Sequence, residues 1–205
     1  IGDKTDMYAQ AYFAYDSKKS GGITMSHLRF GKSPIMSPYL INKADFISCS
    51  QQSYVRQYDL LAGLKKGGKF LLNTVWSDEE LNTHLPASMK RYIAENDIEF
   101  YTVNAVAIAR ELGLGGRFNM VMQSGFFKLA NIIPIDDAVK YLKDAVFTSY
   151  GSKGEKVVNM NNGAIDHGIT SLHRVNVPES WKDAVDEEQP VNEKTPEFII
   201  KIQNI

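Results

Sequence analysis

Lys69-Phe-Leu-Leu-Asn-Thr74, with Ser77-Asp-Glu-Glu80 soon after it, is the stretch that decides the fold of this chain. The first segment is a short apolar run with the composition of a strand. The second is a capping box, in which the side chains of Ser77 and Glu80 bond the first backbone N–H groups of a helix. A strand that leads into a helix is the building unit of α/β folds.

Two further apolar runs flank this unit. Ala44–Cys49 and Glu99–Val103 have the composition of short strands, and a second amphipathic helix begins at Pro86. The apolar spacing over Gln51–Leu64 predicts another helix, which Gly67-Gly68 ends. Short strands that alternate with helices predict a three-layer α/β/α fold with a mostly parallel sheet.

From about Asn104 onward the strand signals disappear. Four added C-terminal helices are expected there, over Asn104–Leu112, Asn119–Ile133, Ile135–Tyr150 and Gly154–Arg174. Residues 178–196 are charged and carry prolines, which is typical of a linker or of an arm laid over another surface. We therefore expect one domain over residues 1–177, helical from about residue 104, and a linker or arm over residues 178–205.

Both ends of the sequence look cut. The chain opens at Ile1 without an initiator methionine or a first strand, and it enters a helical pattern over Thr5–Lys19. An α/β domain that begins on a helix lacks the strand that should precede it. We expect an excised piece of a longer protein.

Composition excludes several classes of function. The 205 residues are 43% hydrophobic and carry a formal net charge of −1, which gives no sign of nucleic-acid or membrane-surface binding. No apolar stretch approaches the roughly 20 residues of a membrane span. The single cysteine, Cys49, cannot form an internal disulfide and is too few for an iron–sulfur cluster. A reducing cytoplasm is the expected compartment.

Polar groups are concentrated in the segment Gly21–Pro38, which holds two cations, one imidazole and four hydroxyls. Ile23–Phe30 has the composition of a strand, and Gly31–Pro38 is predicted to be a loop. A polar loop that leaves a strand of an α/β sheet is a usual ligand site, so we expect this segment at the ligand-binding edge of the sheet. The alternative is a solvated turn in which Arg29 holds the sheet through an ion pair with a carboxylate.

Other chemistries lack their motifs. No Gly-x-Gly-x-x-Gly follows a predicted strand, since Gly113–Gly116 comes after a helix and fits a helix C-cap. His167 and His173 lie six residues apart, and neither has a carboxylate partner at the i, i+4 spacing of a zinc helix. Cys49 is not linked by any motif to a histidine or an acid, which favours an apolar filler over a nucleophile. We expect no catalytic residue and no metal ligand in this chain.

Several motifs resemble those of one family. The first is Gly21-Gly-Ile-Thr-Met-Ser-His-Leu-Arg-Phe-Gly-Lys-Ser-Pro-Ile35, and the others follow it in order: Ala44–Ile47, Leu64–Asn73, Met122–Asn131, Lys156–Asn161 and Val177–Trp181. Together they cover most of the chain and resemble the central, γ-type domain (domain III) of the pyruvate:ferredoxin (flavodoxin) oxidoreductases.

This resemblance implies a multidomain parent that decarboxylates pyruvate oxidatively to acetyl-coenzyme A. Thiamine diphosphate and iron–sulfur clusters are expected in other domains, and ferredoxin or flavodoxin is expected to accept the electrons. The γ-type domain is expected to contribute to the coenzyme A site, and the isolated piece is expected to be inactive. Its partners would be the other domains of the same polypeptide.

Within the segment Gly21–Pro38, the resemblance points to four residues that face coenzyme A: Ser26, Arg29, Lys32 and Ser33. Arg29 offers a rigid fork to phosphate oxygens, and Lys32 offers a mobile ammonium group on a loop next to glycine. The alternative function is a non-enzymatic α/β interaction or scaffold domain that binds no ligand.

Overall fold

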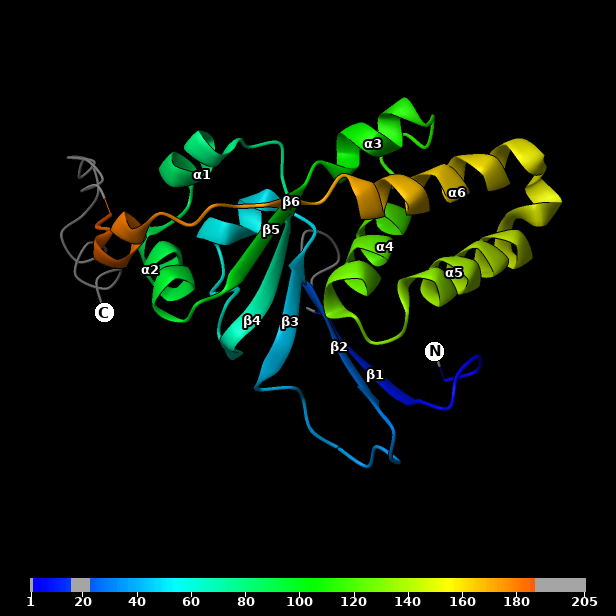
Figure 1. Ribbon diagram of the computed structural model, residues 1–205, viewed down its shortest axis with the longest axis horizontal. Helices are drawn as coiled ribbons and strands as arrows, with labels where there is room; N and C mark the ends of the chain where they lie inside the picture. The colour runs from blue at the N-terminus through cyan, green and yellow to red at the C-terminus, as the bar shows by residue number, and fades with distance from the viewer. Residues whose placement is uncertain (1, 16–22, 187–205) are drawn as a thin grey trace.

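The computed structural model describes residues 2–15 and 23–186, which form two sheets and the helices around them (Figure 1). The strands are β1 (Tyr8–Tyr15), β2 (Thr24–Gly31), β3 (Ala44–Cys49), β4 (Leu64–Asn73), β5 (Glu99–Val103) and β6 (His173–Arg174). The α-helices are α1 (Asp78–His84), α2 (Ala87–Glu95), α3 (Ala105–Glu111), α4 (Asn119–Ala130), α5 (Ile135–Tyr150) and α6 (Glu155–Thr170). Short 3-10 helices lie at η1 (Gln52–Arg56), η2 (Gly151–Lys153) and η3 (Glu179–Asp183).

The main sheet has the strand order β3-β4-β5-β6. Strands β3, β4 and β5 are parallel, and β6 pairs antiparallel with β5 through Tyr101↔Arg174 and Thr102↔His173. The mostly parallel sheet confirms the predicted fold class. The expectation of helices alone after Asn104 is wrong at β6, because the chain that leaves α6 returns to the open edge of β5.

Helices cover both faces of this sheet, as the alternation of side chains along β4 requires. Phe70 and Leu72 are fully buried on the face covered by α1, α2 and η3. Leu71, between them, is fully buried on the opposite face, against α3, α4 and α6. Figure 1 shows these two groups of helices on opposite sides of the strands. The three-layer α/β/α arrangement is therefore confirmed.

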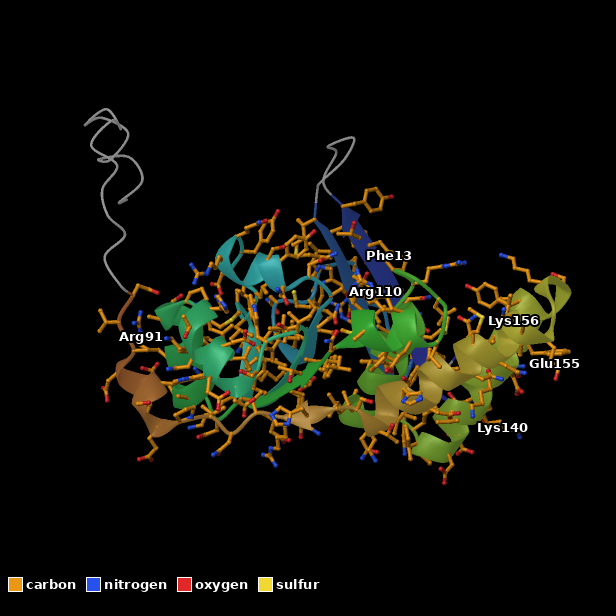
Figure 2. The ribbon with its side chains drawn as sticks, turned by 90° about the horizontal axis from the view of Figure 1, so that it is seen from above. Phe13, Arg91, Arg110, Lys140, Glu155 and Lys156 are labelled. Atoms are coloured by element: carbon orange, nitrogen blue, oxygen red, sulfur yellow. The ribbon has the colours of Figure 1, made fainter. Side chains whose placement is uncertain are left out.

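Helices α4, α5 and α6 pack on one another, and α5 and α6 form a helical hairpin that extends away from the sheet (Figure 1). Lys140, Glu155 and Lys156 lie on this hairpin (Figure 2). Within residues 2–15 and 23–186, no helix is long and apolar enough to cross a membrane.

Several local predictions are confirmed. Ser77 and Glu80 form the capping box of α1 in both directions. Helix α5 has the predicted bounds. These features depend on neighbouring residues alone, so the sequence shows them directly.

The predicted helix over Thr5–Lys19 is wrong within the described part, because Tyr8–Tyr15 is strand β1; residues 16–19 lie outside the described ranges. Strand β1 pairs antiparallel with β2 from Tyr8↔Gly31 to Tyr15↔Thr24. Aromatic residues favour strands, and here pairing with β2 overrides the helix preference of the interspersed alanines. The predicted strand over Ile23–Phe30 exists, but it belongs to this separate hairpin and not to the parallel sheet.

The predicted helix over Gln51–Leu64 is also wrong, except for the single short turn η1. Leu64 begins β4 instead of ending a helix, since it pairs with Ala44 at the start of β3. Gly63 precedes it with φ +81°, and the Ala44 N–H donates to the Gly63 carbonyl at 2.8 Å. Parallel pairing with a distant strand therefore decides this segment.

The chain after α6 lies along the sheet edge and over α1 and α2. The predicted helix over Gly154–Arg174 ends at Thr170, and His173 already belongs to β6. Trp181, beyond the predicted domain end, is 2% exposed and donates from Nε1 to Asn82 Oδ1 at 2.8 Å. Asp186 accepts a hydrogen bond from the Ala87 N–H at the start of α2. Residues 178–186 thus pack on this domain, and the boundary at residue 177 stays a prediction.

Candidate functional site

Arg29, in β2, lies on the face of the β1–β2 hairpin that residues 37–41 cover. Its Nη1 donates to Gln10 Oε1 at 3.0 Å, and its Nη2 donates to the Tyr39 carbonyl at 2.7 Å. The guanidinium carbon lies 5.1 Å from the centre of the Tyr39 ring, within the range of a cation–π contact. Gln10 is directly opposite Arg29 in the strand register, which explains why their side chains meet.

Two more hydrogen bonds fasten the same loop to the hairpin. Gln10 Nε2 donates to the Ser37 carbonyl at 3.0 Å, and the Ile41 N–H donates to His27 Nδ1 at 3.2 Å. Arg29 therefore holds the loop through the Tyr39 carbonyl and pairs with the Gln10 amide oxygen of β1, whereas the sequence alternative supposed a carboxylate. Hydrogen bonds thus hold residues 37–41 of the loop after β2 against the β1–β2 hairpin.

This loop lies at the amino edge of the parallel sheet. It leads into Ala44, the first residue of β3, which pairs with Leu64, the first residue of β4. The carboxyl ends of the strands, at Cys49, Asn73 and Val103, lie at the opposite edge. The expectation that the loop after β2 lies at the usual ligand edge of the sheet is wrong, because β2 belongs to the hairpin and its loop leads into the start of β3. Residues 21 and 22 lie outside the described part.

The four predicted contact residues fall into two groups. Lys32 and Ser33 are neighbours in the loop, and both are exposed. Ser26 is exposed as well, but it lies opposite Phe13, on the hairpin face away from Arg29. Lys32 follows Ser26 by six positions, which is about 20 Å along an extended strand. The structure brings Arg29 and the loop together and leaves Ser26 apart.

A second polar cluster occupies the carboxyl edge of the sheet, where such folds usually bind ligands. Asn73 is 6% exposed; its Nδ2 donates to the Ser50 carbonyl and its Oδ1 accepts from the Ala105 N–H, both at 3.0 Å. Thr74 Oγ1 donates to Gln52 Oε1 at 2.8 Å. These bonds join the ends of β3 and β4 to the start of α3.

Sequence reasoning missed this cluster, although a signal was present. Each parallel strand is followed directly by polar residues, at Ser50, Thr74 and Asn104. The cluster offers hydroxyl and amide groups, and no charged side chain occurs in residues 49–52, 73–76 or 103–105. It therefore suits neutral hydrogen-bonding groups better than a phosphate.

Cys49 lies beside this cluster and is 5% exposed. Burial raises the pKa of its thiol, and a backbone hydrogen bond with Gln51 lowers it only in part. A thiol held in its protonated form is a poor nucleophile, which fits the structural role predicted for Cys49. Among the described residues, no group of three or more histidine, cysteine, aspartate or glutamate side chains is placed to hold a metal ion.

The sequence matches a family model described as pyruvate ferredoxin/flavodoxin oxidoreductase over residues 1–171. The chain is similar to the pyruvate-flavodoxin oxidoreductase of Enterobacter agglomerans, with 67% identity over 200 residues, which is 97% of this chain and 17% of that relative. The chain thus spans about a sixth of the length of this curated relative.

Two solved structures share the fold. The PORC subunit of pyruvate oxidoreductase from Thermotoga maritima superimposes with a TM-score of 0.63 at 17% identity, over 82% of each chain. The 2-oxoglutarate:ferredoxin oxidoreductase of Magnetococcus marinus, solved with 2-oxoglutarate, coenzyme A and succinyl-CoA, gives a TM-score of 0.57 at 19% identity. That match covers 90% of this chain and 27% of the other.

Proposed function

Because this chain belongs to the pyruvate ferredoxin/flavodoxin oxidoreductase family, we propose that it is one domain of a larger enzyme that oxidises pyruvate to acetyl-coenzyme A and carbon dioxide. Ferredoxin or flavodoxin is the proposed electron acceptor, as the family description names both. One cysteine cannot supply the four ligands of an iron–sulfur cluster, so the clusters are assigned to other domains. Thiamine diphosphate is assigned to other domains from the family resemblance alone. The same cysteine count supports a reducing, cytoplasmic compartment.

Within this enzyme, the proposed role of the domain is to contribute to the coenzyme A site through the loop after β2. The observation that supports this role is the exposure of Lys32 and Ser33 on this loop. Arg29, Gln10 and His27 hold the loop in place through hydrogen bonds. A pre-ordered loop loses little conformational entropy when it binds an anion. Residues 49–52, 73–76 and 103–105 at the carboxyl edge include no cation for the same task.

The four residues have different proposed roles. Lys32 pairs with a phosphate of coenzyme A as a point charge, and the Ser33 hydroxyl donates a hydrogen bond to the same group. Arg29 holds the loop and presents its remaining N–H groups to phosphate oxygens. Ser26, on the other hairpin face, would contact a more distant part of the extended ligand. The 2-oxoglutarate oxidoreductase with bound coenzyme A supports this role at the level of a shared fold.

The test is Lys32→Ala in the full-length enzyme. We expect a higher KM for coenzyme A, by about ten- to a hundredfold, because one charge-assisted hydrogen bond contributes about 1.5–3 kcal/mol. The KM for pyruvate and the melting temperature should stay unchanged, since Lys32 is exposed. The matched control is Lys140→Ala, an exposed lysine on α5, which should change none of these values (Figure 2).

An unchanged KM for coenzyme A in Lys32→Ala would remove Lys32 from the site. Arg29→Ala separates the two roles of that residue. If Arg29 only holds the loop, Arg29→Ala loses stability and raises the KM for coenzyme A because the loop becomes disordered. In that case Arg29→Lys should not restore the KM. If it also contacts phosphate, Arg29→Lys recovers part of the affinity.

A further inference from the structure

The exposed apolar side chains of this chain are concentrated in one place. Thirteen large hydrophobic residues are exposed in the described part, and nine of them lie between residues 8 and 40. Scattered exposed hydrophobic residues are ordinary, but a cluster of this kind marks an interaction surface. The nine are Tyr8, Tyr12, Phe13, Tyr15, Met25, Leu28, Met36, Tyr39 and Leu40.

Both faces of the β1–β2 hairpin take part in this surface. Phe13 (55% exposed) and Leu28 (41%) share one face, since Phe13 pairs with Ser26 and Leu28 with Ala11. Tyr12 (56%) and Met25 (50%) share the other. Figure 2 shows Phe13 on the hairpin, well away from Arg91 on α2.

The hairpin contacts the rest of the domain near the end of β2. The Phe30 ring lies 6.1 Å from that of Phe126 in α4, and residues 37–41 cover the Arg29 side. The part toward Tyr15 and Thr24 has exposed residues on both strands. An isolated two-stranded ribbon is only marginally stable in water. A further packing partner would stabilise it.

The two strands of the hairpin are nearly free of charge as well as rich in exposed apolar residues. Strand β1 carries no charged residue, and the one permanent charge in β2, Arg29, already binds Gln10 and Tyr39. Tyrosine, phenylalanine and methionine are the residues enriched in protein interfaces, and charged residues are depleted from interface cores. The chemistry of the two strands fits a neutral, apolar protein surface.

We propose that this hairpin is an interdomain contact, in which another domain of the same oxidoreductase packs against Phe13, Leu28 and Tyr12. The inference rests on the proposed function, and it adds the surface that joins this domain to the rest of the enzyme. The curated relative is about six times as long as this chain, so other domains are covalently tethered nearby. Such tethering gives effective concentrations in the millimolar range.

A second copy of this domain fits the surface less well. A two-fold contact between identical ribbons would cover one face of each ribbon and leave the other face bare. A larger domain can enclose both faces. The geometry of the hairpin therefore favours a domain outside these 205 residues.

The experiment places a photo-crosslinking residue, p-benzoylphenylalanine, at position 13 of the full-length enzyme. Phe13 is aromatic and exposed, so this replacement preserves the fold. After irradiation, the crosslinked peptides are identified by mass spectrometry. The expected product joins position 13 to a peptide from outside residues 1–205. A crosslink to a peptide within residues 1–205, or no crosslink at all, would overturn the proposal.

A second substitution tests whether the apolar face carries the contact. Leu28→Glu, added to the crosslinking enzyme, should lower the crosslink yield at least tenfold, because it buries a charge in the interface. The matched control is Phe147→Glu, an equally drastic change at an exposed residue of α5, which should leave the yield unchanged. Equal yields in the two variants would contradict the proposal. These readouts need no coenzyme A, so they are independent of the Lys32→Ala result.

Discussion

At Gly168, where α6 crosses α4, the neighbouring atoms leave no room for a side chain. A Cβ atom built there would overlap Ser124 Oγ and the Val121 carbonyl oxygen, and would lie 2.9 Å from Val121 Cα. Gly168→Ala should therefore destabilise the protein by about 1–3 kcal/mol, despite the better helix propensity of alanine. Gly163→Ala, in the same helix, is the control, since its Cβ would meet only the end of the Leu112 side chain at 3.2 Å. Denaturant unfolding measures both, and equal stabilities would contradict the close-packing argument.

At the scale of elements, Asn73 joins β3, β4 and α3 at the carboxyl edge. Asn73→Leu would leave the Ser50 carbonyl and the Ala105 N–H without their side-chain partner. Each unsatisfied buried group costs about 1–3 kcal/mol, so for the two groups we expect a loss of about 2–6 kcal/mol in the free energy of unfolding. Asn73→Asp keeps the acceptor for Ala105 and should lose less. Asn159→Leu, at an exposed position of α6, should stay close to wild type in the same chemical denaturation experiment.

At the scale of the whole molecule, the chain after β6 packs against helices α1 and α2. The Trp181 ring lies 6.5 Å from that of Phe100 in the sheet, and its Nε1 bonds Asn82 of α1. Trp181→Ala should cost about 3–5 kcal/mol through the cavity it leaves. Lys182→Ala, at an exposed neighbour in η3, should change stability by less than about 0.5 kcal/mol. Thermal unfolding distinguishes them, and a mild Trp181→Ala variant would show that residues after 177 are dispensable.

The strand and loop of the segment Gly21–Pro38 were predictable from the sequence, but their position in the fold was not. The composition of Gly21–Pro38 identified the polar loop, and its strand and loop boundaries agree closely with the structure. The sequence did not show that β1 pairs with β2, because that register joins segments separated by nine or more residues and uses no motif. Because β2 pairs with β1 and not with the parallel sheet, the loop after β2 lies at the amino edge of that sheet.

The sequence by itself determined the α/β class, the capping box at Ser77, helix α5 and the absence of a cysteine cluster, because each depends on local periodicity, capping or composition. Tertiary structure alone decided that Tyr8–Tyr15 is a strand, that Leu64 begins β4, and that His173–Arg174 completes the sheet. In each of these three places, pairing with a distant strand outweighs a weak local helix preference of a few tenths of a kcal/mol per residue. Long-range hydrogen bonding and burial, which no local window contains, are the physical reason.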